Sequence, residues 1–217
     1  MNILQLSKNM NVGGVSSHII ELSRQLQLMG HTVIVASTGG TQVEELKKDN
    51  IKHITVDFLS KNLYVQFKNI NKLVNIIKDD DINIIHTHWR ITSVSAKIIS
   101  KITGVDFVWT NHLNNIPSSF FYRTFTFYGK KVITVSNDMV PFLQSKLNIR
   151  KEKIKVVANA VDKSKYILPS FDLKRNYQEK YGVNPTEKVI TLLGRLAPVK
   201  GHLFLIEALH EITLKHP

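Results

Sequence analysis

Short runs of β-branched and aliphatic residues alternate with amphipathic helical patterns along most of this 217-residue chain. The predicted strands cover residues 2–6, 32–36, 52–56, 82–86, 105–110, 131–135 and 153–157. The predicted helices between them cover residues 15–29, 42–49, 62–79, 91–102, 119–129 and 138–147. Strands that alternate with helices of this length pair in parallel, and the helices cover both faces of the sheet. With right-handed crossovers, this pattern predicts an α/β fold with a doubly wound parallel sheet.

Two of these helices have an apolar face that we expect to pack against the sheet. The face of the first helix contains Val15, Ile19, Leu22, Leu26 and Met29, and Gly30 follows as a C′ glycine. The face of the long helix contains Leu63, Phe67, Ile70, Val74 and Ile77.

The chain is predicted to contain one complete domain and the start of a second one. Residues 1–162 hold all seven predicted strands described so far. Residues 163–187 contain Pro169 and Pro185 and one short helical stretch at 172–181, which is typical of an interdomain connection. Residues 188–217 then predict a βα unit, with a strand at 188–193 and a helix at 202–215. A strand without neighbours leaves its faces uncovered, so residues beyond about 163 should dock on the first domain, pair with another copy or be poorly ordered.

Composition restricts the compartment and leaves several partners open. The chain has no cysteine, which excludes disulfides and thiolate metal sites and favours a reducing compartment. It has neither a secretory leader pattern nor an apolar run long enough to cross a bilayer, so we expect a cytoplasmic protein. The net charge of +12 fits phosphorylated substrates, an anionic membrane or simply a lysine-rich composition. Nucleic acid is the least favoured partner, because no groove-reading motif is present.

Polar side chains and glycines follow the predicted strands at one edge of the sheet. In an open α/β sheet, ligands bind beyond the carboxyl ends of the strands. The residues expected to line this cleft are His88, Asn111, His112, Ser136 and Asn159. His86 and His88 alternate across a strand end, so they should point to opposite sides and form no metal pair. His112 fits either a hydrogen-bonding or proton-handling group or a packed histidine.

Gly13 and Gly14 lie between the first strand and the first helix. Two glycines allow a ligand close to the backbone, and N–H groups at a helix start attract phosphate or hydroxyl groups. The alternative is a flexible turn. Residues 9–14 do not match the dinucleotide fingerprint G-x-G-x-x-G.

Arg195 and Lys200 lie on the predicted turn between strand 188–193 and helix 202–215. An arginine suits bidentate phosphate contacts, a lysine supplies a point charge, and the helix start favours anions. This pattern predicts a diphosphate site, against the simpler alternative of a solvated basic turn.

Aromatic and basic residues alternate over residues 117–131. Such a segment could rest on an anionic membrane surface, which would make the protein peripheral. The aromatic side chains could equally belong to a helix packed on the sheet, since residues 121, 125 and 128 share a helical face.

The order of these motifs resembles the family 4 glycosyltransferases of the GT-B fold. The motifs are Gly13-Gly14, GHTVIVAS (30–37), DINIIHTH (81–88), TNH (110–112), VITVSNDM (132–139), VVANAVD (156–162), GRLAPVKG (194–201) and IEAL (206–209). The resemblance implies a Rossmann-like domain that binds the acceptor and a second domain that binds a nucleotide sugar. It also implies transfer of the sugar to a hydroxyl group of a glycan or lipid-linked acceptor, with retention at the anomeric carbon, as in cell-envelope polysaccharide synthesis.

The same resemblance implies roles for individual residues. Gly13 and Gly14 would approach the donor phosphates or the acceptor, and His112 would contact the transferred sugar. Arg195 and Lys200 would neutralise the leaving diphosphate, so no metal or other cofactor is expected.

The chain also departs from the family pattern. Ala160 replaces the glycine of the usual Asn-Gly-Val-Asp, and the family's pair of glutamates, seven residues apart, is absent up to residue 217. We therefore expect an incomplete second domain and a portion that does not turn over by itself. The alternative is a degenerate member that binds a glycan, a lipid or a protein partner without catalysis.

Overall fold

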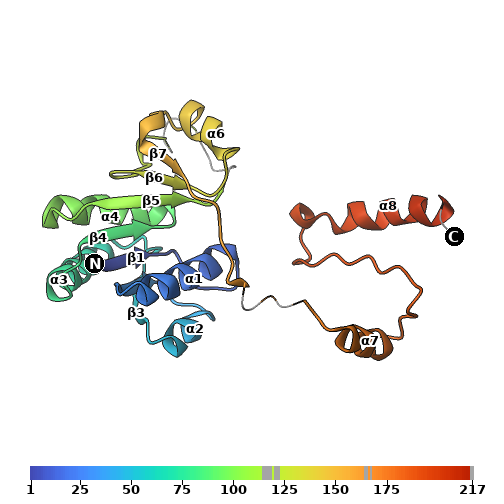
Figure 1. Ribbon diagram of the computed structural model, residues 1–217. Helices are drawn as coiled ribbons and strands as arrows, with labels where there is room; N and C mark the ends of the chain where they lie inside the picture. Colours follow the sequence, from blue (N-terminus) through green and yellow to red (C-terminus); the bar gives the residue numbers. More distant parts are fainter. Residues whose placement is uncertain (114–118, 120–122, 164–165, 167, 216–217) are drawn as a thin grey trace. The chain divides into compact units, whose positions relative to one another are not determined.

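The structure is a computed structural model that describes residues 1–113, 119, 123–163, 166 and 168–215. Its contacts divide the chain into two compact units, Met1–Asp162 and Lys163–Pro217 (Figure 1). Each unit is described by itself. The first contains the sheet with its helices, and the second contains two helices joined by extended chain.

The first unit is built on one parallel sheet with the strand order β3-β2-β1-β4-β5-β6-β7. Its strands are β1 (Asn2–Leu6), β2 (Thr32–Ser37), β3 (Lys52–Thr55), β4 (Ile84–Thr87), β5 (Phe107–Asn111), β6 (Val132–Thr134) and β7 (Ile154–Val156). All neighbouring pairs are parallel. The order reverses direction at β1, as expected for a doubly wound sheet, so the predicted α/β class is confirmed.

The helices cover both faces of this sheet (Figure 1). They are α1 (Gly14–Leu28), α2 (Val43–Lys48), α3 (Leu63–Asp79), α4 (Arg90–Thr103) and α6 (Met139–Ser145). Helices α3 and α4 pack with strand residues such as Leu4 and Leu6 in one core cluster. Helices α1 and α2 pack with Val33 and Val35 in a second cluster, and α6 lies in a third cluster around Trp109. Alternation along the strands therefore sends successive side chains to different cores.

Local sequence signals explain where the helices begin and end. The side chain of Asn62 caps α3 by accepting a hydrogen bond from the backbone N–H of Tyr64 at 2.9 Å. Gly104 ends α4 in the left-handed conformation, and Gly30 follows α1 with a φ of 80°. The C′ role predicted for Gly30 is confirmed.

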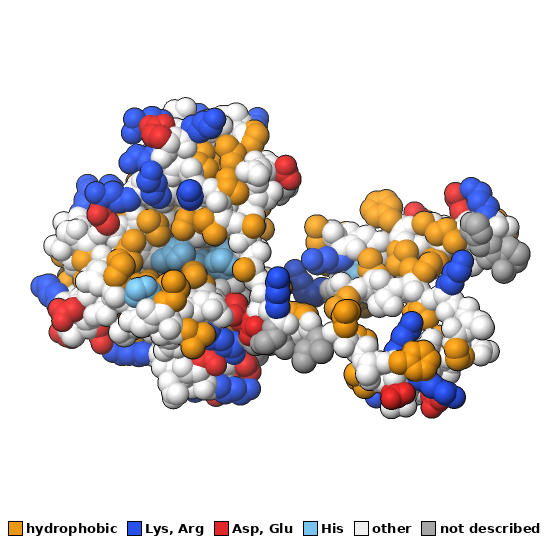
Figure 2. Space-filling view, in the orientation of Figure 1, with side chains coloured by type: hydrophobic (Ala, Val, Ile, Leu, Met, Phe, Trp, Pro, Cys, Tyr) orange, Lys and Arg blue, Asp and Glu red, His pale blue; other side chains and the backbone are white. Residues whose placement is uncertain are grey.

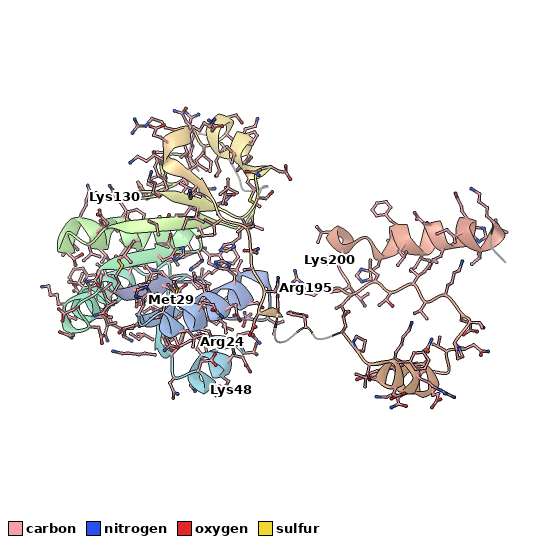
Figure 3. The ribbon with its side chains drawn as sticks, viewed as in Figure 1. Arg24, Met29, Lys48, Lys130, Arg195 and Lys200 are labelled. Carbon is pink, nitrogen blue, oxygen red and sulfur yellow. The ribbon has the colours of Figure 1, made fainter. Side chains whose placement is uncertain are left out.

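The apolar faces of the two helices are only partly buried. Val74 and Ile77 of α3 lie in the core, but Leu63 and Phe67 are 84 % and 64 % exposed. The prediction that the whole face is buried was wrong, because only residues from Ile70 onward in α3 pack in the core cluster. Met29, at the end of α1, is likewise exposed (Figure 3).

The predicted helix at 119–129 lies partly outside the described residues. Of the described part, residues 123–124 are helical, residues 126–128 are not, and Gly129 forms a bridge with Val108 of β5. Phe127 packs on the α3–α4 cluster and Tyr128 on the α6 cluster. The prediction of a helix is therefore wrong for residues 126–129, where the chain pairs with β5 through Gly129.

The second unit contains α7 (Phe171–Lys180), a short 3-10 helix at Pro198–Lys200 and α8 (His202–Lys215). The predicted helices at 172–181 and 202–215 are confirmed. Residues 188–193 form no strand, which corrects the prediction. A strand needs a hydrogen-bonded neighbour, and no described residue pairs with this segment.

Among the described residues, no helix combines the length and the apolar character that crossing a bilayer requires.

Candidate functional site

The site lies where the strand order reverses, between β1 and β4. Strand β1 pairs with β2 on one side and with β4 on the other, so the loops after β1 and β4 leave toward opposite faces. This divergence opens a crevice at the carboxyl ends of the strands. The loop after β1 leads into α1, whose N-cap is Gly13. A Cβ atom on Gly13 or Gly14 would have no other atom within 4 Å, so the start of α1 is open to a ligand.

The loop after β2, which contains Gly39 and Gly40, is hydrogen-bonded to the loop after β1. Backbone hydrogen bonds join the loop after β1 to the loop after β2: the N–H of Met10 donates to the carbonyl of Gly39 at 2.8 Å. The N–H of Gln42 donates to the carbonyl of Met10 at 2.7 Å. At Gly40, with a φ of 144°, a Cβ atom would lie 2.4 Å from the carbonyl carbon of Met10. Glycine is therefore required at Gly40 for the two loops to meet.

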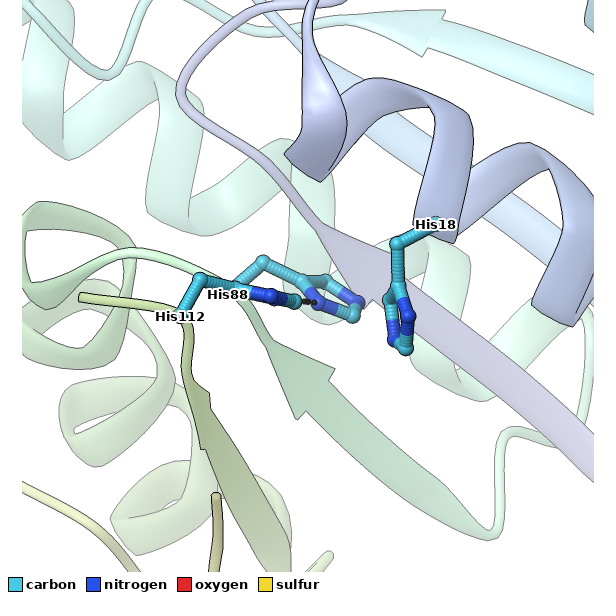
Figure 4. A group of neighbouring side chains, drawn as sticks. All are labelled: His18, His88 and His112. Carbon is cyan, nitrogen blue, oxygen red and sulfur yellow. Dashed lines mark hydrogen bonds between the residues drawn. The ribbon is translucent and has the colours of Figure 1, made fainter. Parts of the chain in front are cut away.

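Three histidines from different elements meet under this crevice (Figure 4). His18 lies in the second turn of α1, His88 directly follows β4 and His112 directly follows β5. Nδ1 of His88 is hydrogen-bonded to Nε2 of His112 at 3.2 Å. The ring of His18 lies edge-on to both others, with centroids 4.9 Å from His112 and 5.7 Å from His88.

His86 joins this cluster from inside β4. Its ring centroid lies 4.3 Å from that of His88, and its Nε2 lies 2.7 Å from Oγ1 of Thr110. The prediction that His86 and His88 point to opposite sides was therefore wrong. Residues two apart along an extended chain lie on the same face, so His86 and His88, on either side of Thr87, point to the same side.

Burial keeps these imidazoles neutral at physiological pH. Desolvation is the main cause in each case, because burial disfavours the charged form. It lowers the pKa of His86 to about 3 and that of His112 to about 4, and it holds the pKa of His88 well below its usual value. Burial also lowers the pKa of His18, although a hydrogen bond with the side chain of Asn159 partly offsets this. The cluster offers hydrogen-bonding groups without a charge.

Neutral imidazoles are also the form that binds transition metals. One ring nitrogen from each of His18, His88 and His112 lies within 4.8 Å of the others, a spacing at which three imidazoles can hold a divalent ion. In this arrangement, however, both ring nitrogens of His88 are hydrogen-bonded, Nδ1 with His112 and Nε2 with Gln5. The cluster is therefore built as a hydrogen-bonded group.

A pocket of about 250 Å³ opens beside the histidines. Its lining is mostly apolar, with basic and amide groups between the apolar side chains. The lining residues are Lys8, Val15, Leu59, His88, Trp89, Arg90, Ile91, Trp109, Asn111, His112 and Leu113. Nζ of Lys8 lies 5.8 Å from the ring centroid of Trp89, a cation–π contact that holds the ammonium group at this pocket. Figure 2 shows histidine side chains gathered in the first unit with hydrophobic side chains around them.

Most predicted cleft residues are found at this edge. Asn111 and His88 line the pocket and are buried, and His112 lines it half-buried. Asn159 is exposed and reaches the cluster through His18. Ser136 has a local role: its Oγ donates to Asp138 and accepts from the backbone N–H of that residue at 3.2 Å.

Arg195 and Lys200 belong to the second unit, where both are exposed (Figure 3). Lys200 ends the 3-10 helix just before α8, and a Cβ atom added at Gly194 would lie 3.4 Å from Cγ of Lys200. The two basic residues are thus placed on the turn before a helix start, as the sequence indicates.

Several residues of the site carry little or no signal in the sequence. His18 is hidden within the apolar pattern of α1, and its one signal is its position one turn after Gly14. Lys8 and Trp89 carry no spacing signal, because their meeting depends on β1 and β4 being neighbours.

Comparison with known sequences gives a family for this arrangement. The model of "Glycosyltransferase Family 4" matches residues 12–165, which is more than half of the chain. An uncharacterized glycosyltransferase of Methanocaldococcus jannaschii is 26% identical over 225 residues, covering 94% of this chain and 57% of that protein. The chain therefore spans little more than half the length of this relative.

Solved structures show the same relationship. The crystal structure of a glycosyltransferase from Rickettsia africae superposes with a TM-score of 0.84 at 34% identity, covering 97% of this chain and 57% of the other. Anabaena HepE, solved in complex with UDP-glucose, has a TM-score of 0.76 at 22% identity, again covering 97% of this chain and 57% of the other. Both agree with the parallel sheet described above. By its match to the family model and its similarity to the Rickettsia glycosyltransferase, the chain belongs to Glycosyltransferase Family 4.

Proposed function

We propose that this chain carries the acceptor-binding part of a transferase that moves a sugar from a nucleotide-sugar donor to a hydroxyl group, with retention at the anomeric carbon. The observation that supports it most directly is the group of uncharged imidazoles at the pocket, beside the open start of α1. A transferred sugar is neutral and rich in hydroxyl groups. Neutral imidazoles and backbone N–H groups bind such a ligand without an unpaired buried charge.

The donor is a nucleoside diphosphate sugar in this proposal. The structural neighbour from Anabaena was solved with UDP-glucose, which supports a donor of that class. Arg195 and Lys200 would neutralise the diphosphate as it leaves. The backbone N–H groups at Gly13 and Gly14 would approach the donor phosphates or the acceptor. The positive charge of the two side chains stabilises the transition state electrostatically while an oxocarbenium-like sugar forms, so no metal or other cofactor is required.

The acceptor supplies the attacking hydroxyl, and the pocket favours one with an apolar portion. Leu59, Ile91 and Leu113 contribute apolar surface, and Lys8 adds a cation at the same pocket. This combination suits a glycan that is linked to a lipid through an anionic group. We further propose that the protein is cytoplasmic and reaches such acceptors at the inner face of a membrane, with the aromatic and basic segment 117–131 as the contact.

The transferase proposal is tested with the 217-residue chain and, in parallel, with any longer product of the same reading frame. Each is incubated with labelled UDP- and GDP-sugars and with lipid-linked and free glycans, and product formation is followed. NMR of the product gives the anomeric configuration. Transfer by the longer product with a retained configuration would support the proposal, and an inverted configuration would contradict the retaining mechanism. No binding of any nucleotide sugar by a folded longer product would overturn it.

A non-catalytic binding role is the second candidate. It is favoured by one observation: every residue that lines the pocket comes from the first unit, so a ligand can bind there without the second. Saturation-transfer NMR with glycans and lipid-linked glycans on the 217-residue chain separates the two roles. Binding without turnover in every form of the protein would favour the non-catalytic role.

Membrane contact is tested with sedimented vesicles of anionic lipid. Arg123→Glu, within segment 117–131, should lower the bound fraction several-fold, because a basic side chain near an anionic surface contributes about 1 kcal/mol. Arg175→Glu on α7 is the matched control. Equal binding of both variants and the original chain would contradict contact through this segment.

A further inference from the structure

A chain of hydrogen bonds runs from the backbone of α1 to His112. Oγ of Ser23 donates to the carbonyl of Ile19 at 2.7 Å, and Nε2 of Gln5 donates to Oγ of Ser23 at 2.7 Å. Oε1 of Gln5 lies 2.9 Å from Nε2 of His88. Nδ1 of His88 lies 3.2 Å from Nε2 of His112. The chain thus links the middle of β1, where Gln5 is fully buried, to the pocket.

The direction of each hydrogen bond follows from the first one. A carbonyl oxygen accepts only, so Ser23 uses its single hydroxyl proton toward Ile19 and can only accept from Gln5. The amide of Gln5 must therefore present its NH2 group to Ser23 and its oxygen to His88. An amide oxygen also only accepts, and this places a proton on Nε2 of His88.

The tautomer of His112 follows from that of His88. Desolvation keeps both His88 and His112 neutral at pH 7, so each ring carries one N–H. With its proton on Nε2, His88 offers a lone pair at Nδ1, and Nε2 of His112 must donate to it. Nδ1 of His112 is then a lone pair. It has no hydrogen-bond partner among the described residues, and His112 lines the pocket.

We propose that Gln5 and Ser23 are positioning residues of the sugar site, which hold His88 and His112 in their Nε2–H forms. His112 then offers Nδ1 to the ligand as a hydrogen-bond acceptor, so the site selects a ligand with a hydroxyl donor at this point. The identity of the ligand rests on the proposed function, but the tautomers of the two histidines do not.

Replacement of Gln5 should change the tautomers of His88 and His112 to the form that imidazole disfavours in water. Gln5→Met keeps the length of the side chain and removes the acceptor for Nε2–H of His88. The best remaining arrangement is for His88 to donate from Nδ1 to His112, because a buried donor without an acceptor is costly. His112 would then carry its proton on Nδ1. Both histidines should therefore change to the Nδ1–H form, although imidazole in water prefers Nε2–H.

The tautomers are measured on the 217-residue chain labelled with 15N-histidine. Long-range 1H–15N correlation spectra at neutral pH distinguish protonated from bare ring nitrogens. The original chain should show His88 and His112 as Nε2–H. Gln5→Met should show both as Nδ1–H. Gln5→Glu restores an acceptor oxygen and should return them to Nε2–H, with a higher pKa for His88 beside the carboxylate.

Two further variants test the role of Ser23 and provide a matched control. Ser23→Ala frees the amide of Gln5 to rotate, so it should give a mixture of tautomers even where Gln5→Met fails to fold. Gln25→Met is the matched control, because Gln25 is exposed on the same helix as Ser23 and its side chain donates to Glu21 at 3.0 Å. Its spectrum should equal that of the original chain. The proposal would be overturned if folded Gln5→Met kept both histidines in the Nε2–H form. If Gln5→Met does not fold, unchanged Nε2–H forms in Ser23→Ala would overturn it.

The consequence for the ligand is measured separately, in a longer product that transfers sugar. Gln5→Met should lower kcat/KM about tenfold, the loss of about one hydrogen bond to the ligand, and Gln5→Glu should restore most of it. A change of tautomer with unchanged kcat/KM would overturn the ligand role of Nδ1. If no form transfers sugar, the proposed function fails, and the spectra still decide the tautomer assignment.

Discussion

The backbone of Met10 occupies the place that a side chain on Gly40 would need, since a Cβ atom there would lie 2.4 Å from the carbonyl carbon of Met10. The loops after β1 and β2 can therefore join only with a glycine at this position. This contact holds the loop that carries Gly13. The stability of the sheet edge and the opening of the site therefore both depend on Gly40.

Gly40→Ala should destabilise the protein by about 2–4 kcal/mol, because the new methyl group meets backbone and the φ of 144° is unfavourable for alanine. Urea denaturation gives the change in unfolding free energy. Gly14→Ala is the matched control: it lies in open space at the start of α1 and should change stability by no more than about 1 kcal/mol. Equal effects of the two substitutions would contradict the close approach of the loops.

The buried histidines predict that the protein loses stability in weak acid. His86 and His112 have pKa values lowered to about 3 and about 4 in the folded state, against the usual value of 6.5. Between pH 6.5 and about 4, the unfolded chain binds protons that the folded protein does not bind. The unfolding free energy should be level above pH 7 and should fall through this window by about 1.4 kcal/mol per pH unit for each histidine.

Urea denaturation at several pH values measures this slope. His112→Asn should reduce the slope between pH 6 and about 4 by about one proton. His210→Asn, at an exposed position on α8, serves as the control and should leave it unchanged. A stability that is flat or rises as the pH falls through this window would contradict the neutral state of the cluster.

Side-chain cations should carry the diphosphate charge in a product that transfers sugar. Arg195→Ala and Lys200→Ala should each lower kcat about a hundredfold, because each removes charge stabilisation from the transition state. A chelator should leave the rate unchanged. Arg175→Ala is the control, since Arg175 is exposed and pairs with Glu179 at 3.2 Å within α7. Loss of activity on chelation, restored by a divalent ion, would contradict the metal-free mechanism.

Exposed apolar side chains in the second unit should promote self-association of the 217-residue chain. Leu193 is 98 % exposed, and Leu196 and Val199 on the same segment are also exposed. Sedimentation velocity should show a concentration-dependent dimer that Leu193→Asp weakens, because apolar surface drives association. Leu28→Asp, at an exposed position on α1, should have no such effect. A monomer at all concentrations would exclude pairing with another copy.

The sequence predicts the strands well because each one is a local run of apolar residues. All seven strands from β1 to β7 lie within about two residues of their predicted positions. Segment 188–193 has the same local character and forms no strand. A strand depends on a partner as well as on its own residues, and the local pattern of this segment contains no information about one.

Exposure of the helix faces shows the same limit. Periodicity identifies the apolar side of α3, but it does not tell that Val74 is buried and Phe67 is exposed, because this depends on what each turn packs against. The residues of the site depend on tertiary packing in the same way. His88 and His112 could be found as residues after strands, whereas Gln5 looks like an ordinary polar residue within a strand until the packing of α1 on β1 brings Ser23 to it.

The position of β1 between β2 and β4 has a consequence for the order of folding. Contacts within β1–α1–β2 join residues close in sequence, but the pairing of Leu4 with Ile85 closes a long loop. Such distant pairings form slowly, because the entropy of loop closure is lost before the contact is gained. The histidine cluster needs that late pairing as well as β5. During synthesis, a nascent chain should therefore acquire its first half as a separate nucleus and become competent to hold a ligand only after Asn111 and His112 have emerged.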